Sequence, residues 1–261
     1  MRRRPDLTVS MTTIPSRLPL LSTVLEHILS QSCADFDLHL YLPEFCERTH
    51  ERYELPNYLT EYGHKLKICT TSRDYGPATK LLGPLDTIEA KPGEERGSVI
   101  TIDDDVLLEP HAIEELATAR ARYPREVLGF MGVSAGHFIH AETLAANGLC
   151  ERTVGVLGGY RGILYPLDVV DQSLLDDYDA VTDRCRPFLD DDHLFAWNLA
   201  RRGVPRRVIS TSHPGPDSGL NIQLLDLPDA ITFGPDSGAA VQQSHHRLID
   251  YYQSRGWAYP T

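Results

Sequence analysis

The chain has 261 residues, enough for one large domain or two small ones with a substantial core. Its 37 acidic and 25 basic residues give a formal charge of −12, which argues against general nucleic-acid binding and against docking on anionic lipid. Hydrophobic residues make up 41% and charged residues 24%, so the composition is that of a folded globule and not of a disordered chain.

The cysteines are scattered and odd in number, so we expect neither a disulfide framework nor a cysteine-based zinc site. They are Cys33, Cys46, Cys69, Cys150 and Cys185. Reduced thiols in a cytoplasmic protein are the expectation. No apolar run reaches about 18 residues, so no membrane span is expected. Pro5 and Asp6 interrupt the apolar run that would make the basic start a signal peptide, so none is expected either.

The first half of the chain alternates between predicted strands and helices. Apolar patterning predicts strands at residues 7–11, 37–42, 65–70 and 98–102, and helices at residues 18–30, 78–88 and 111–123. This order is typical of an α/β fold with a mostly parallel sheet covered by helices. Ligands of such sheets bind beyond the carboxyl ends of the strands. The loops that begin at Thr12, Asp74 and Asp103 follow strands and should therefore converge.

The second half is less regular. It offers an apolar, strand-like run at residues 127–133, a segment rich in glycine and aromatics at 155–165, a helix at 190–202 and a strand at 206–211. A long loop at residues 214–236 and a last helix at 239–255 follow. We find no repeat and no linker, and we expect a single domain spanning residues 1–261.

The strongest chemical feature is the run Asp103-Asp104-Asp105 at the end of a predicted buried strand. Three adjacent carboxylates repel one another, and a hard cation such as Mg²⁺ or Mn²⁺ would relieve that repulsion. Strand geometry would point Asp103 and Asp105 the same way, so these two can share a site. A solvated acidic turn is the competing interpretation.

A second feature is a tight turn at Asp74, Gly76 and Pro77 that leads into a helix. Helix N-termini favour phosphate, and Lys80 in the first turn can reach one. An ordinary helix start with an exposed lysine is the alternative. The phosphate-binding pattern G-x-x-x-x-G-K is absent.

A third feature is a second acidic run, Asp190-Asp191-Asp192, at a helix N-terminus. One aspartate can cap the helix, and a spare carboxylate can act as a general base. His213 follows the strand at 206–211 and can complete a metal site. His245 and its neighbour His246 are expected to face solvent or to pack locally.

The order of these features resembles the nucleotide-sugar-dependent glycosyltransferases of the GT-A fold. The resemblance spans roughly residues 7–213. It is carried by residues 12–17, 74–80, the 103–105 triplet (an Asp-x-Asp element), the Gly158–Gly162 segment, and the acidic helix 190–203. It implies a Rossmann-like, mostly parallel central sheet with a smaller mixed acceptor-side sheet. Residues 1–125 would be the nucleotide-sugar half and residues 126–261 the acceptor half.

The resemblance also implies roles for individual residues. Donor-binding residues would be Thr12, Arg17, Asp74, Lys80, Asp103 and Asp104. Metal ligands would be Asp105, Asp103 and His213. The base would be one of Asp190, Asp191 and Asp192, with Asp191 favoured. Acceptor-side residues would be Gly159, Tyr160 and Arg161.

The activity implied is metal-dependent transfer of a hexose or pentose from a nucleoside-diphosphate-sugar to an acceptor hydroxyl in glycan biosynthesis, with inversion. The implied cofactor is Mn²⁺ or Mg²⁺. The implied partners are a donor, a UDP-sugar being favoured, and a glycan or other hydroxyl acceptor.

Three alternatives remain open. Asp103 to Val106 also resembles the nucleophile motif of haloacid-dehalogenase-type phosphohydrolases, although that motif normally opens its domain. A non-catalytic nucleotide- or sugar-binding module would need no base. A sugar nucleotidyltransferase would need a glycine-rich basic loop near the N-terminus, and residues 12–17 contain no glycine.

Overall fold

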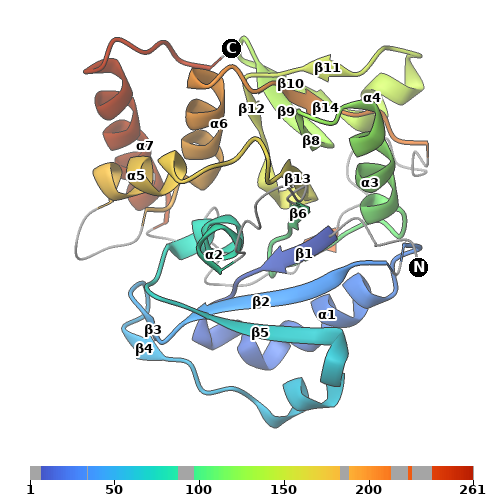
Figure 1. Ribbon diagram of the computed structural model, residues 1–261, viewed down its shortest axis with the longest axis vertical. Coiled ribbons are helices and arrows are strands. Elements are labelled where there is room, and N and C mark those ends of the chain that lie inside the picture. Colours follow the sequence, from blue (N-terminus) through green and yellow to red (C-terminus); the bar gives the residue numbers. More distant parts are fainter. Residues whose placement is uncertain are drawn as a thin grey trace.

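The computed structural model describes residues 7–33, 35–87, 97–182, 188–212, 223–224 and 237–260. Its centre is an eight-stranded sheet with helices on both faces (Figure 1). The strands lie in the order β11 (Arg152–Thr153), β14 (Arg206–Val208), β8 (Val127–Gly129), β13 (Ile163–Pro166), β6 (Ser98–Thr101), β1 (Leu7–Met11), β2 (Asp37–Pro43) and β5 (Leu66–Thr71).

Within the described part of the chain, four of the seven neighbouring pairs in this sheet are parallel and three are antiparallel. The predicted α/β class and mostly parallel sheet are therefore confirmed. The smaller sheet contains β10 (His137–His140), β9 (Met131–Ser134) and β12 (Val156–Leu157). Its pairs are antiparallel, so the expectation of a mixed sheet was wrong. Two short ribbons pair β15 (Gln223–Leu224) with β7 (Val106–Leu107) and β3 (Phe45–Cys46) with β4 (Glu51–Arg52).

The helices divide between the two faces of the large sheet. They are α1 (Leu21–Leu29), α2 (Thr79–Thr87), α3 (Ala112–Arg122), α4 (Ala141–Ala146), α5 (Ser173–Val181), α6 (Asp191–Arg201) and α7 (Ser237–Gln253). Short 3-10 helices are η1 (Pro15–Leu20), η2 (Asn57–Lys65), η3 (Gly76–Ala78) and η4 (Gly159–Arg161). Side chains of α1 and α3 pack in one apolar cluster, and those of α2, α5, α6 and α7 pack in another. None of the helices in the described residues is long and apolar enough to cross a bilayer.

Strand β6 contributes to both of these cores. Successive side chains of a strand point to opposite faces of its sheet. Accordingly Ile100 belongs to the cluster under α1 and α3, whereas Val99 belongs to the cluster under α2 and α5–α7. Both side chains are fully buried. The acidic triplet therefore follows a strand whose position is fixed from both sides.

Helices α5, α6 and α7 pack together around one buried carboxylate. Asp177 of α5 accepts hydrogen bonds from Asn198 Nδ2 at 2.8 Å, Tyr252 Oη at 2.8 Å, Tyr251 Oη at 2.9 Å and Arg201 Nη2 at 3.1 Å. Each donor comes from α6 or α7. A buried carboxylate with this many donors is well satisfied. Asp177 thus joins α5 and α7 to α6, the helix that begins with the second acidic run.

Several predicted boundaries needed correction. The apolar run at residues 127–133 is not one strand: it divides into β8 in the large sheet and β9 in the small one. Helix α5 was not expected. The predicted loop at residues 214–236 falls almost wholly outside the described residues, apart from β15, and His213 also lies outside them.

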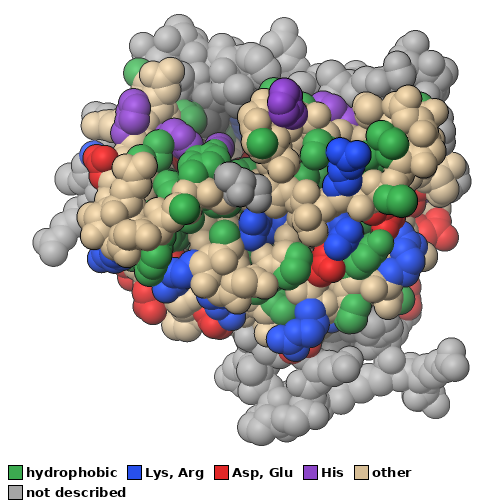
Figure 2. All heavy atoms as spheres, turned by 90° about the horizontal axis from the view of Figure 1, so that it is seen from above, with side chains coloured by type: hydrophobic (Ala, Val, Ile, Leu, Met, Phe, Trp, Pro, Cys, Tyr) green, Lys and Arg blue, Asp and Glu red, His purple; other side chains and the backbone are tan. Residues whose placement is uncertain are grey.

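The face seen in Figure 2 has a mixed surface. Lysine and arginine side chains are interspersed there with acidic and hydrophobic ones, and the coloured side chains form no continuous basic patch on that face. This agrees with the formal charge of −12.

Candidate functional site

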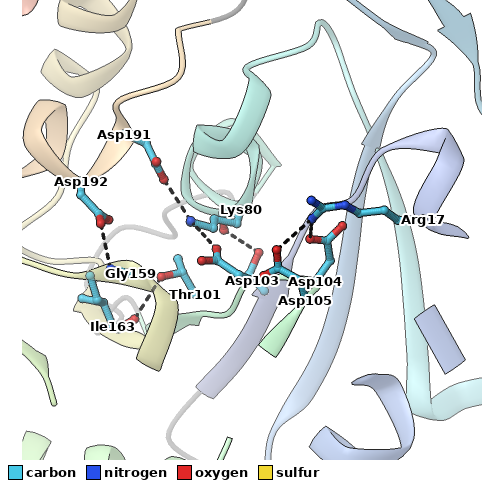
Figure 3. A network of polar contacts seen from close by, with 11 residues as sticks. Arg17, Lys80, Thr101, Asp103, Asp104, Asp105, Gly159, Ile163, Asp191 and Asp192 are labelled. Atoms are coloured by element: carbon cyan, nitrogen blue, oxygen red, sulfur yellow. Dashed lines mark hydrogen bonds and ion pairs between the residues drawn. The ribbon is translucent and has the colours of Figure 1, made fainter. Parts of the chain in front are cut away.

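The candidate site lies where strands β1 and β6 end. These neighbours are parallel, so their carboxyl ends meet at one edge of the sheet. Arg17 lies in η1, which follows β1, and the acidic triplet follows β6. Lys80 lies in the first turn of α2. Figure 3 shows these side chains pointing toward one another, with the start of α6 beside them.

Arg17 holds two members of the triplet. Its Nη1 lies 2.5 Å from Asp104 Oδ1 and 3.2 Å from Asp105 Oδ2. The Thr13 hydroxyl donates to the other oxygen of Asp104 at 2.5 Å. Strand β6 ends at Thr101, and Asp104 and Asp105 lie in a turn. The strand alternation expected for the triplet therefore does not apply, and these two neighbours reach the same guanidinium.

The triplet carries more negative charge than its neighbours compensate. Burial, and then the neighbouring Asp104 and Asp103, raise the pKa of Asp105 to about 6. Burial also raises the pKa of Asp104, although Arg17 opposes the shift. A divalent cation would lower the cost of these charges. The donor set suits Mg²⁺ or Mn²⁺, which often take one or two carboxylates and complete their shell with phosphates and water.

Lys80 connects the two acidic runs. Its Nζ lies 2.6 Å from Asp103 Oδ1 and 3.0 Å from Asp191 Oδ2 (Figure 3). Burial alone would lower the pKa of this amine, but the attraction of Asp103 and Asp191 outweighs it and keeps the pKa well above its usual value. The hydroxyl of Ser10 in β1 donates to the carbonyl of Lys80 at 2.6 Å. The lysine is therefore buried, charged and anchored to the sheet, and it is not the exposed residue of the alternative interpretation.

The three aspartates at the start of α6 have three different environments. Asp190 occupies the N-cap position without a side-chain hydrogen bond to the helix backbone, so the expected cap is not formed. Its carboxylate instead contacts His193 Nδ1 at 2.7 Å and His245 Nδ1 at 2.5 Å. Asp191 faces Lys80, and Asp192 accepts from another part of the chain.

Asp192 accepts a hydrogen bond from the Gly159 backbone, whose N–H donates to Asp192 Oδ2 at 2.9 Å. Burial, and then the charge of Asp191, raise the pKa of Asp192 to about 7. A Cβ at position 159 would lie 2.7 Å from Asp192 Oδ1 and 3.5 Å from Lys80 Nζ. A side chain at this position would therefore displace the Asp192 carboxylate, whereas the Lys80 amine lies at an ordinary contact distance.

The other two acceptor-side candidates lie in the same short helix, η4. Arg161 is buried, with Nη2 3.6 Å from Glu109 Oε1 and its guanidinium above the Phe130 ring. Tyr160 is half-buried against the apolar cluster that contains the side chains of α1 and α3. Arg161 thus packs into the interior, and an acceptor role for either residue stays a prediction.

Two predicted donor-binding residues form local contacts instead of joining the Lys80 network. The Thr12 hydroxyl donates to the carbonyl of Tyr41 at 2.8 Å. Asp74 accepts from the N–H of Gly76 at 2.6 Å and of Glu47 at 2.8 Å, which organises the turn before α2. Burial raises the pKa of Asp74 despite these two donors.

Sequence reasoning missed two histidines. His245 does not simply face solvent: it is half-buried and meets Asp190 across the α6–α7 contact. His193 follows Asp190 by three positions, the spacing that places two side chains on one helical face. That spacing was a usable signal for His193, whereas the contact with α7 has no local signature.

The chain was compared with protein-family models, curated proteins and solved structures, and only the solved structures gave matches. No protein-family model matches the chain, and no curated protein matches it. Among solved structures, a similar chain is the mannosyltransferase PcManGT from Pyrobaculum calidifontis, in complex with GDP-Man and Mn²⁺. The two are 15% identical with a TM-score of 0.47, and the match covers 80% of this chain and 55% of that one. The chain thus spans about half the length of this neighbour.

Proposed function

We propose that this protein is a metal-dependent glycosyltransferase of the GT-A type, which moves a sugar from a nucleoside-diphosphate-sugar to an acceptor hydroxyl with inversion. One observation carries the proposal. Two acidic runs far apart in the sequence meet at a single buried lysine, Lys80, at the carboxyl ends of parallel strands. This is the edge of an α/β sheet where ligands bind.

The cationic side chains would bind the diphosphate of the donor. Lys80 is positioned to exchange a carboxylate partner for a phosphate oxygen, since its Nζ already bridges two anions. Arg17 can interact with the second phosphate while keeping Asp104 in place. These local cations allow a protein of charge −12 to accept an anionic donor.

The metal would be held by Asp105 and Asp103, with Asp104 fixed by Arg17 and Thr13. A bound divalent cation supplies Lewis-acid stabilisation of the leaving diphosphate. Asp105 suits this role because its carboxylate is partly exposed and lies beside two other negative charges. We expect a UDP-sugar to be the preferred donor.

The base would come from the pair Asp191 and Asp192. A general base works best when its pKa lies near the working pH, and burial raises the pKa of both carboxyls. We favour Asp191, because transfer of Lys80 from its carboxylate to a donor phosphate would release that carboxylate beside the sugar. Asp192, held by the Gly159 N–H, is the second choice.

A donor screen tests the binding half of the proposal. Calorimetry with UDP-, GDP-, TDP- and CMP-sugars, with and without Mn²⁺, should give one preferred nucleotide whose binding depends on the cation. Asp105→Ala should remove most of that metal dependence, and Asp176→Ala, an exposed carboxylate on α5, should not. Equal affinity in excess EDTA would refute the metal-dependent donor site.

Turnover and stereochemistry test the chemical half. Asp191→Asn should retain donor binding and cut the transfer rate by roughly 10²-fold or more if Asp191 is the base. Lys80→Ala should weaken donor binding and slow turnover as well. NMR of the product should show an inverted anomer. A retained anomer, or full activity in both Asp191→Asn and Asp192→Asn, would overturn the assignment of the base.

The same measurements address the alternatives. A phosphohydrolase would cleave a generic aryl phosphate and ignore nucleoside diphosphates. A binding module would bind a nucleotide-sugar without turnover in the wild type, in Asp191→Asn and in Asp192→Asn alike.

A further inference from the structure

A group of potential metal ligands lies where α7 packs against the start of α6. Asp190 Oδ1 lies 2.7 Å from His193 Nδ1, and Asp190 Oδ2 lies 2.5 Å from His245 Nδ1. The two imidazole rings meet edge to face, with centroids 4.6 Å apart. One ligand atom from each of the three residues lies within 4.8 Å of the other two. In the described part of the chain, no other group of three such residues meets this criterion.

We propose that Asp190, His193 and His245 bind a zinc ion at a site separate from the 103–105 triplet. Two imidazole nitrogens and one carboxylate oxygen form a donor set that zinc accepts, with a fourth position left for water. Zinc lies about 2.0–2.2 Å from such ligands, so tetrahedral ligand atoms sit roughly 3.3–3.6 Å apart. The three ligand atoms already lie within 4.8 Å of one another, so no pair would have to shift closer by more than about 1.5 Å.

The surroundings permit that shift. The side chains of His193 and His245 are 31% and 30% exposed, so both rings have room to turn and one side of the group is open to water. Asp190 occupies the N-cap position of α6, and its carboxylate is only 8% exposed. A buried carboxylate with two partly exposed imidazoles can adapt to a tetrahedral ion.

Ligand chemistry separates this site from the triplet. Imidazole nitrogen favours Zn²⁺ over Mg²⁺ and Mn²⁺, whereas an all-carboxylate site favours the harder ions. Asp191 and Asp192 follow Asp190 directly in the chain, and a dication at Asp190 would interact favourably with any negative charge on them. A dication held here would fasten α7 to the residue that precedes both proposed bases.

Zinc titration of the metal-stripped full-length protein tests the proposal. Calorimetry without nucleotide or acceptor should show one zinc ion bound per chain. His245→Ala should weaken binding by at least about 10–100-fold, since even loss of a residue that supports a ligand has an effect of that size. The matched control is His246→Ala, which removes the exposed neighbour on the same helix and should leave the affinity unchanged. Asp105→Ala should also leave it unchanged.

X-ray absorption spectroscopy of the zinc-loaded wild-type protein tests the site without any substitution, so misfolding of a variant cannot affect the result. It should show two imidazole ligands with nitrogen or oxygen at about 2.0–2.1 Å. Absence of zinc binding, equal loss in His246→Ala, or a coordination shell without imidazole would overturn the proposal and would leave Asp190 and the two histidines as a hydrogen-bonded cluster only. None of these results bears on sugar transfer, because nucleotide and acceptor are absent.

Discussion

Removing the Asp177 carboxylate should destabilise the protein strongly without touching the candidate site. In Asp177→Ala, the Tyr252 hydroxyl loses its acceptor and one N–H of the Asn198 amide does too, while the amide keeps its bond to Ser173 Oγ at 3.1 Å. Both residues are fully buried. Each unsatisfied buried donor costs about 1–3 kcal/mol. Tyr251 and Arg201 are partly exposed and can turn to water. We therefore expect the free energy of unfolding to fall by about 4 kcal/mol.

Urea unfolding at fixed pH measures this loss. A decrease of about 4 kcal/mol should lower the midpoint by more than about 1 M. Asp177→Asn keeps one oxygen acceptor and the shape of the side chain, so its loss should be about half as large. The control Asp176→Ala removes an exposed carboxylate one position earlier on α5 and should cost less than about 1 kcal/mol, the size of its interaction with the helix dipole. If Asp177→Ala and Asp176→Ala lose equal stability, the role assigned to the buried carboxylate is wrong.

Three further substitutions test close packing. A Cβ at Gly83 would lie 2.6 Å from the Tyr41 ring. Gly83→Ala should therefore lower the free energy of unfolding, measured in urea, by about 1–2 kcal/mol, a net value that includes the gain in helix propensity. A stabilised variant would contradict this. The nearest neighbours of a Cβ at Gly159 would be side-chain atoms, the Asp192 carboxylate and the Lys80 amine, and no backbone atom. Gly159→Ala should therefore leave the melting temperature within a few degrees but reduce the proposed transfer activity by displacing the carboxylate; unchanged activity would refute that. Phe138 is 68% exposed, and Phe138→Ser should change the free energy of unfolding by less than about 0.5 kcal/mol; a larger loss by the same urea measurement would show that this ring is packed.

The sequence predicted the part of the fold that depends on regular apolar patterns. Strand β1 was predicted with its observed bounds, and the starts of β6 and α6 were placed within one residue. The prediction of a single strand at residues 127–133 was wrong because these residues are almost all apolar or glycine. Such a pattern does not indicate the residue at which the chain leaves one sheet and enters another. Helix α5 was missed although Leu174, Leu175, Tyr178 and Val181 follow helical spacing.

For the candidate site, the sequence predicted the residue types and the edge of the sheet, but not the contacts between them. The residue types and the strand-end positions indicated two acidic runs and a lysine. Their joining through Lys80 depends on packing between segments distant in the chain, which leaves no local pattern. The same reason explains why His245 was expected only to face solvent or to pack locally. It also explains why one of the three aspartates was expected to cap the helix, whereas the carboxylate of Asp190 contacts two histidines.

Strand β6 has a consequence for how this architecture can change by recombination. It is four residues long, yet Val99 completes one core and Ile100 the other. On its two edges it pairs with β1 from the first half of the chain and with β13 from the second. Residues of both halves of the chain contribute to each of the two cores that β6 separates. Exchange of the first 125 residues between related chains would therefore have to preserve the contacts on both faces of β6 as well as its pairing with β13. Changes in the loops beyond the strand ends leave these contacts intact.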